Sequence, residues 1–199
     1  MNITINNANL QYQNQQTPTI KNYITTTEND QGIDISSLIG SYKYNKVKIE
    51  ASFIALPVSG TSNCRVFFTN NSYVNINAKG TTLTCKLTED VTATIVSGET
   101  NSVTIDPSVP SVTINSDTTS VSGTVSGTSI TSAFLLCTPS GSSTAGMVKL
   151  NSIKFTDIDN GTVIADLKPA LDLNNTPCLY DTENGVCYYE KDSGTLAVG

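Results

Sequence analysis

The residues that most hydrolases use for acid–base chemistry are missing from this sequence. The chain contains no histidine, which removes the usual general base and the Ser-His-Asp and Cys-His arrangements built on it. Glycoside hydrolysis needs two carboxylates that face one cleft, and some sandwich glycosidases carry them on one strand as Glu-x-Asp-x-Glu. This chain has no such run, and its glutamates are scattered. We therefore expect a protein that is not an enzyme.

One loop, Asp157-Ile-Asp-Asn-Gly161, has carboxylates at alternate positions before a glycine, as a cation loop could. An EF-hand would need its glycine at position six and a bidentate glutamate at position twelve. Those positions hold Thr162 and Lys168, so the EF-hand pattern fails. We predict instead that the two aspartates and the asparagine are turn residues whose side chains cap nearby backbone amides. A calcium site of another type stays an alternative, and no cofactor is expected.

The five cysteines show no metal-type Cys-x-x-Cys pairing, and they are Cys64, Cys85, Cys137, Cys178 and Cys187. No secretory signal is visible at the amino terminus, so we expect synthesis in a reducing cytosol and buried free thiols. A disulfide between the last two is disfavoured, because a two-residue turn at Asn184-Gly185 would place Thr182 opposite Cys187. Cys178 would then lie four residues, or about 13 Å, along the strand from the position opposite Cys187. This distance exceeds the Cα separation that a disulfide tolerates.

Tyrosines are the residues that would have to stack on a sugar, because the chain has no tryptophan. Sugar recognition usually combines an exposed aromatic platform with amides and carboxylates. The candidate glycan contacts are Tyr42, Tyr73 and Tyr188, and an exposed tyrosine can equally be an ordinary surface residue. Side chains alternate along a strand, so we expect one of Tyr188 and Tyr189 in the core and the other exposed.

Strands are the elements that must position these side chains, because polar and apolar residues alternate along most of the chain. In residues 46–53, the alternation predicts that Val47, Ile49, Ala51 and Phe53 share the buried face. Further strands are predicted at 65–68, 84–87, 91–95, 103–105, 112–114 and 148–150. The best helical candidate is one turn at residues 36–40, ended by Gly40. This pattern predicts an all-β fold, a two-sheet antiparallel β-sandwich with very little helix.

Composition agrees with that fold and excludes some partners. Only 14% of the 199 residues are charged, and the formal net charge of −6 argues against binding nucleic acid. Apolar runs are far shorter than the roughly 20 residues of a membrane helix, so we expect a soluble protein that does not bind membranes.

Two regions differ from the rest of the chain. Residues 1–22 are rich in Asn and Gln and are predicted to form an N-terminal arm or first strand, with the sandwich over 23–199. The Ser/Thr-rich stretch 97–132 fits either a protruding edge that contacts another subunit or plain surface strands.

The last fifty residues predict two hairpins. Asn160-Gly161 and Asn184-Gly185 each lie between β-rich runs, and in a two-residue turn both residues would take a positive φ. Residues 178–181 carry a Leu-Tyr-Asp run, and Gly194-Thr195 follows the second hairpin.

This string resembles the C-terminal end of concanavalin-A-like (laminin-G-type) jelly-roll modules of tailed-bacteriophage virion proteins. In those modules a hairpin with an Asn-Gly turn is followed by Leu-Tyr-Asp, a second turn, an aromatic strand and a glycine-containing tail. Residues 21–24, 32–35 and 46–50 resemble the opening strands of such modules. The resemblance covers about residues 21–199, and the middle, from about 57 to 132, departs from the family pattern.

The resemblance implies a non-enzymatic virion structural protein, displayed on the particle as capsid decoration, head fibre or tail-associated component. Such a protein would be made in the bacterial host cytoplasm and would contact other capsid or tail proteins and copies of itself, as a homo-oligomer. The alternative is a glycan-binding, lectin-like receptor-binding module for host attachment, which would contact a host surface glycan.

Overall fold

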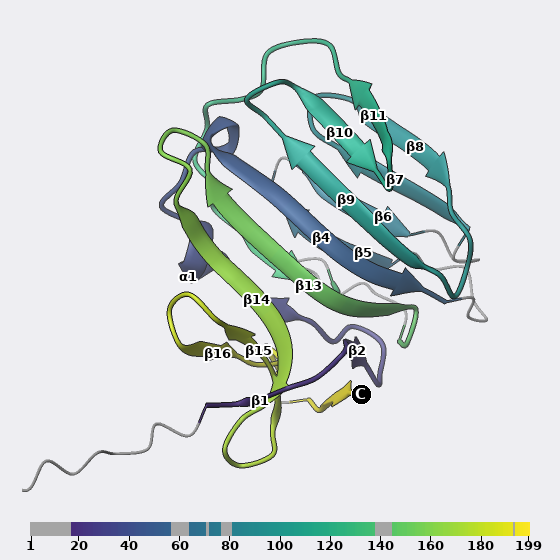
Figure 1. Cartoon of the computed structure of the whole chain (residues 1–199), viewed down its shortest axis with the longest axis vertical. Helices are drawn as coiled ribbons and strands as arrows, with labels where there is room; N and C mark the ends of the chain where they lie inside the picture. The colour runs from purple at the N-terminus through teal and green to yellow at the C-terminus, as the bar shows by residue number, and fades with distance from the viewer. Residues whose placement is uncertain (1–16, 57–63, 71, 77–80, 138–144, 193) are drawn as a thin grey trace, which may run out of the picture.

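The computed structural model describes residues 17–56, 64–70, 72–76, 81–137, 145–192 and 194–199. Within these residues the chain forms two antiparallel β-sheets stacked face to face (Figure 1). Helix is limited there to α1 (Ser36–Ile39) and one 3-10 turn, η1 (Tyr44–Lys46). The predicted all-β class and low helix content are confirmed. The predicted helical turn is also confirmed, because Gly40 ends α1 and its N–H donates to the Ser36 carbonyl at 2.8 Å.

The larger sheet has the strand order β11-β10-β9-β4-β13-β14-β15-β16, and three short strands extend it. The strands of the main path are β4 (Val47–Ala55), β9 (Thr100–Asp106), β10 (Ser111–Ile114), β11 (Asp117–Ser120), β13 (Val148–Asp157), β14 (Val163–Leu171), β15 (Pro177–Asp181) and β16 (Val186–Tyr188). β1 (Thr19–Ile20) pairs with β14, and β2 (Ile24–Thr26) pairs with β13 and β17 (Leu196–Val198).

The smaller sheet has the strand order β3-β12-β5-β6-β7-β8. Its strands are β3 (Ile33–Asp34), β5 (Cys64–Thr69), β6 (Tyr73–Ile76), β7 (Thr82–Lys86), β8 (Asp90–Thr94) and β12 (Ala133–Leu135). All the strand pairs of this sheet are antiparallel.

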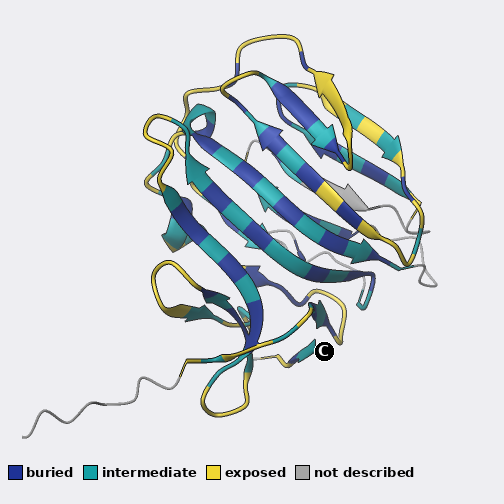
Figure 2. Ribbon diagram, in the orientation of Figure 1, coloured by how far each residue is buried: buried dark blue, intermediate teal, exposed yellow. Residues whose placement is uncertain are grey.

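The core lies between the two sheets and follows from the period-two pattern. β4 alternates between buried and half-buried residues along its whole length, as predicted for Val47, Ile49, Ala51 and Phe53. Phe67 of the smaller sheet packs against Phe155 of the larger one, with ring centroids 5.7 Å apart. Each such buried side chain contributes about 1.5–3 kcal/mol relative to exposure. Figure 2 shows this alternation along β4. In β13 two successive residues, Asn151 and Ser152, are half-buried, and in β14 two pairs of successive residues, Ile164–Ala165 and Pro169–Ala170, are buried.

Both Asn-Gly corners reverse the chain, but through four-residue loops rather than two-residue turns. Asp181 pairs with Val186, and the Gly185 N–H donates to the Asp181 carbonyl at 2.8 Å. Gly161 makes the same bond to Asp157. The two glycines have φ of +73° and +71°, whereas neither preceding asparagine has a positive φ. The prediction that both residues of each pair take a positive φ is therefore wrong.

The longer loop corrects the predicted position of the cysteines. Cys187 lies opposite Tyr180 rather than Thr182, so Cys178 is two residues from the partner of Cys187 instead of four. All five cysteines are free thiols, and all except the half-buried Cys187 are buried. Burial raises the pKa of the Cys64 and Cys85 thiols to about 12, which keeps both of them protonated and unreactive.

The two regions set apart by composition lie at the margins of the larger sheet. Residues 1–16 of the predicted arm lie outside the described residues, and residues 19–20 form β1, exposed beside the end of β14. Stretch 97–132 supplies β9, β10 and the edge strand β11, all four residues of which are exposed. It therefore forms surface strands that include an open edge, and the contact proposed for that edge stays a prediction.

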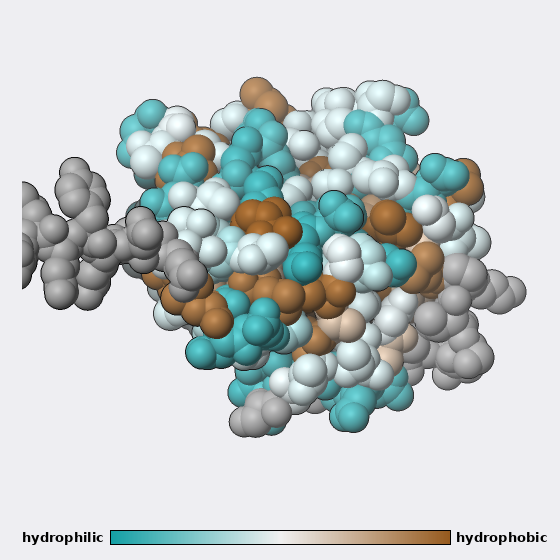
Figure 3. All heavy atoms as spheres, turned by 60° about the horizontal axis from the view of Figure 1, so that its bottom comes forward, coloured by the Kyte–Doolittle hydropathy of each residue, from teal (hydrophilic) through white to brown (hydrophobic). Residues whose placement is uncertain are grey.

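The end of the sandwich that holds β1 exposes apolar side chains. Figure 3 brings this end forward and shows hydrophobic residues set among hydrophilic ones. Ile20 and Leu173 are 50% and 61% exposed, and Tyr189 is 44% exposed. The Tyr189 hydroxyl donates to Asp172 in the loop after β14, at 2.9 Å.

Candidate binding surfaces on the two outer faces

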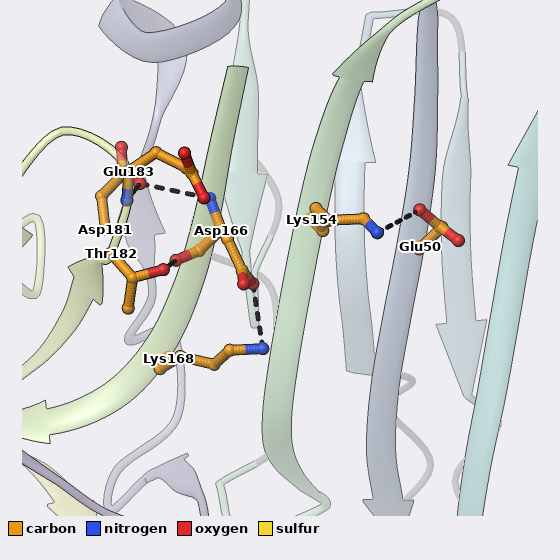
Figure 4. A network of polar contacts seen from close by, with 7 residues as sticks. All are labelled: Glu50, Lys154, Asp166, Lys168, Asp181, Thr182 and Glu183. Carbon is orange, nitrogen blue, oxygen red and sulfur yellow. Dashed lines mark hydrogen bonds and ion pairs between the residues drawn. The ribbon is translucent and has the colours of Figure 1, made fainter. Parts of the chain in front are cut away.

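A row of charged side chains crosses the outer face of the larger sheet. The register places Glu50 of β4 beside Lys154 of β13, and Lys154 beside Asp166 of β14. On the other side, Thr104 of β9 lies opposite Glu50. Strands from three separate parts of the sequence, β4, β9 and the hairpin β13–β14, thus bring their polar side chains into one line, part of which Figure 4 shows.

The charges in this row neutralise one another. Lys154 Nζ lies 2.9 Å from Glu50 Oε2, and Lys48 Nζ lies 3.4 Å from Glu50 Oε1. Lys168 Nζ lies 2.9 Å from Asp166 Oδ1 (Figure 4). We name this surface, with Lys48, Glu50, Lys154, Asp166 and Lys168, the paired-charge face.

Two pKa values reflect the pairing. Burial of Glu50 opposes its charged form, but the hydrogen bond from Lys154 and the charges of both neighbouring lysines outweigh it and lower the pKa of Glu50. The pKa of Lys154 is raised, chiefly by its hydrogen bond to Glu50. A general acid in glycoside hydrolysis needs a raised carboxyl pKa, and Glu50 has the opposite.

A shallow depression of about 290 Å³ lies along the paired-charge face. Besides the charged row, it is lined by the hydroxyl groups of Ser52, Ser102, Thr104 and Ser152. The surface can donate and accept hydrogen bonds over several strands, but its cations already have carboxylate partners.

One end of the row is anchored by the buried carboxylate of Asp181. Asp181 Oδ1 accepts hydrogen bonds from the backbone N–H of Asp166 and of Glu183, at 3.1 and 3.0 Å. Its Oδ2 accepts from Asn184 Nδ2 at 2.6 Å. The Thr182 hydroxyl donates to the Asp166 carbonyl, as Figure 4 shows. Asp181 therefore holds the last hairpin against β14 and has a structural role.

Asp157 caps the equivalent turn of the first hairpin, as predicted. Its carboxylate accepts from the Asp159 N–H at 2.9 Å and from Asn160 Nδ2 at 3.2 Å. Asn160 Oδ1 in turn accepts from the Thr162 N–H at 2.8 Å. Asp159 differs from the prediction, because its carboxylate pairs with Lys46 instead of a backbone amide. Within the described parts of the chain, no group of three or more acidic, Cys or His side chains is placed to hold a metal ion.

Aromatic side chains form a second row, on the outer face of the smaller sheet. Phe134 lies opposite Phe68, and Phe68 lies opposite Tyr73. Each of the three is half-buried, whereas the residues on both sides of Phe134 and of Phe68 are buried in the core. The complete row across the six strands is Asp34, Phe134, Phe68, Tyr73, Lys86 and Asp90.

Two cations and one carboxylate surround Tyr73. The Arg65 guanidinium lies over the Tyr73 ring, 4.1 Å from its centroid, and Lys86 Nζ is 6.0 Å away. The Tyr73 hydroxyl donates to Asp90 Oδ1 at 2.9 Å. Burial and then the hydrogen bond to Asp90 raise the pKa of Tyr73, so the phenol is neutral. We name this surface, with Phe134, Phe68, Tyr73, Arg65 and Lys86, the aromatic face.

The three tyrosines proposed as glycan contacts lie on separate elements. Tyr73 belongs to the aromatic face, whereas Tyr42, after α1, and Tyr188, on β16, are half-buried and pack against the core. No contact joins any two of them among the described residues. The predicted alternation holds at the end of β16, because Tyr188 packs against the core and Tyr189 is exposed.

Tyr73 is the one member of the aromatic face that was predicted from the sequence; Phe68, Phe134, Arg65 and Lys86 were missed. Residues 65–68 were expected to alternate, but a register shift between Arg65 and Phe67 leaves Val66 and Phe67 both buried. The shift turns Phe68 outward. Phe134 lies in an apolar run, residues 133–137, that carries no alternation to show which side chain points out.

Comparison with models of known protein families and with curated proteins finds no match for this chain. Among the described residues, none of the helices has the length and apolar character needed to cross a membrane.

Proposed function

We propose that this chain is a non-enzymatic structural protein of a tailed-bacteriophage virion, built as a concanavalin-A-like jelly roll. It is displayed on the particle as capsid decoration, head fibre or tail-associated component. The order of the C-terminal elements supports the proposal. Hairpin β13–β14, the Leu-Tyr-Asp strand β15, the second Asn-Gly turn, β16 and the Gly-Thr tail before β17 follow in the order that the family resemblance implies.

The mechanism is assembly. The paired-charge face spans several strands, has only a shallow depression, and carries little net charge because its lysines and carboxylates are paired. It can therefore lie against a neighbouring protein, with polar contacts spread over its area. We assign attachment to the particle to this face. Binding to a symmetric scaffold or to further copies then stabilises the folded chain by mass action.

Purified particles test the proposal. The protein should co-purify with virions through a density gradient, and its copy number should be measured by quantitative mass spectrometry. Hundreds of copies per particle indicate capsid decoration, and a few copies indicate the tail. Recovery only in the particle-free fraction of the lysate would contradict the proposal.

The N-terminal segment offers a second test of attachment. Deleting residues 1–16 keeps β1 and its pairing with β14, so the sandwich should remain folded. We expect the deletion to abolish incorporation into particles, because we propose that this Asn/Gln-rich arm contacts the scaffold in addition to the paired-charge face. Unchanged incorporation would show that these residues have no part in assembly.

A second candidate function, binding of a host surface glycan, is favoured by the aromatic face. Outward-pointing aromatic side chains on three adjacent strands, with polar groups beside them, have the composition that sugar-binding surfaces require. A glycan array probed with the purified chain tests this candidate. A chain that binds no glycan on the array would exclude it and leave the structural proposal unaffected.

A further inference from the structure

We infer that the aromatic face binds an extended glycan chain that carries carboxylate groups. Phe134 and Phe68 stack on sugar rings, and Arg65, supported by the Tyr73 ring, pairs with a carboxylate together with Lys86. The inference rests on the glycan-binding candidate above and adds the site, the class of ligand and the role of each residue.

The spacing of the row suits a linear chain. Adjacent strands lie about 4.8 Å apart, so the side chains of Phe134, Phe68 and Tyr73 span about 10 Å across the sheet. This length is comparable to two consecutive sugar rings. The three side chains are half-buried, so their bases are fixed by neighbours while the outer part of each ring remains accessible. Aromatic faces carry partial negative charge and attract the C–H groups of a sugar ring.

The cations give the row its preference for acidic ligands. Among the described residues, neither Arg65 nor Lys86 forms an ion pair with a carboxylate, whereas Lys48, Lys154 and Lys168 on the paired-charge face all do. Arg65 is also the single arginine of the chain. Its planar guanidinium can bind a carboxylate through two parallel hydrogen bonds.

Tyr73 positions the arginine rather than stacking on the sugar. Because the guanidinium lies 4.1 Å from the ring centroid, it already occupies one face of the Tyr73 ring. A cation held over an aromatic face is stabilised and partly desolvated there. The hydrogen bond from the Tyr73 hydroxyl to Asp90 holds the outer end of the tyrosine side chain in place. Stacking therefore falls to Phe68 and Phe134.

The carboxylates at the two ends of the row already accept hydrogen bonds. Asp34 Oδ1 accepts from the Ser36 N–H at 2.8 Å, and Asp90 Oδ1 accepts from Tyr73. Their negative charge disfavours a ligand carboxylate at the ends. The carboxylate of the ligand is thus directed to Arg65 and Lys86. The neutral hydroxyl groups of the sugar lie beside Asp34 and Asp90 at the two ends of the row.

A matched pair of polymers tests the charge requirement. Full-length protein is titrated with polygalacturonate and with the methyl ester of the same polymer, and a glycan array that includes other uronates, sialylated glycans and their neutral counterparts is run in parallel. We expect binding to carboxylated glycans and at least tenfold weaker binding to the esterified or neutral counterparts. Added salt should weaken the binding, because charge pairing contributes to it.

Variants test the residue roles. Arg65→Gln and Phe134→Ala should each lower the affinity for the carboxylated ligand at least fivefold, while Lys168→Gln on the paired-charge face should leave it unchanged. Circular dichroism of each variant checks the fold. If Phe134→Ala unfolds the protein, the test uses the two arginine variants instead. Arg65→Gln should lower the affinity for the carboxylated ligand, and Arg65→Lys, which keeps the positive charge, should lower it less.

The possible outcomes separate this inference from the function on which it rests. Binding of neutral glycans alone, or binding that Arg65→Gln leaves intact, would overturn the inference while glycan binding stands. Binding of no glycan on the array would overturn both.

Discussion

The two outer faces of the sandwich are built by the same alternation but leave their polar groups in different states. On the paired-charge face, Glu50 and Asp166 each lie within ion-pair distance of a lysine. On the aromatic face, Arg65 stacks on Tyr73 and forms no ion pair with a carboxylate among the described residues. The difference teaches that residue types alone do not reveal which face can take a ligand. What matters is whether neighbouring strands supply a partner for each charge.

The largest effect is expected from the core that supports both faces. Phe155 is fully buried beside Lys154 and contacts Phe67, which lies beside Phe68. Phe155→Ala should lower the free energy of unfolding by about 3–5 kcal/mol, because it removes the ring and leaves a cavity. Urea denaturation followed by circular dichroism measures this. A loss below about 1 kcal/mol would show that the two sheets do not share the core described here.

A smaller effect, confined to the larger sheet, is expected from Asp181. Asp181→Ala leaves the backbone N–H groups of Asp166 and Glu183 without their acceptor, which should cost about 3 kcal/mol of stability. Asp157→Ala is the matched control, because Asp157 caps the same type of turn at a more exposed position. Its expected cost is about 1 kcal/mol. Equal losses in the two variants, measured by urea denaturation, would argue against the anchoring role of Asp181.

The smallest effect is expected from the ion pairs of the paired-charge face. Lys154→Gln should cost about 0.5–1 kcal/mol at neutral pH, since both partners are partly exposed to solvent. The pKa of Glu50 is lower in the folded chain, so its stabilisation is present above its ordinary pKa of 4.5 and is lost as the pH falls through the lower folded value.

The pKa of Lys154 is raised above its ordinary value of 10.5, so the lysine contribution is present below that value and is lost as the pH rises through the folded pKa. The difference in stability between wild type and Lys154→Gln should therefore shrink in acid below about pH 4.5 and in base above about pH 10.5. Thermal denaturation across this range measures it, and a difference independent of pH would exclude the pairing as its cause.

Local pattern was enough to predict strands such as β4, because burial there depends only on which side of the sheet each residue points to. It did not predict β6 or β11. Pairing between strands could not be predicted in the same way. Lys154 meets Glu50 only because β13 and β4 are neighbours in a particular register, which no local signal encodes. Phe68 was missed for a related reason, since the register shift after Arg65 reverses the side to which the following residues point.

The turns show how one overlooked residue changes a geometric prediction. Asn-Gly alone predicts a two-residue turn, yet in both hairpins an aspartate precedes the asparagine by three residues and caps a longer loop. That aspartate was the available signal for the longer loop. Reading it would have placed Cys187 opposite Tyr180, as the structure does.

The most direct test of the account is electron cryomicroscopy of an intact particle that contains this chain. The account predicts density for a two-sheet sandwich on the virion surface, with the paired-charge face against a neighbouring protein and the aromatic face toward solvent. Particles without such density, or a sandwich whose aromatic face is buried against the scaffold, would contradict it.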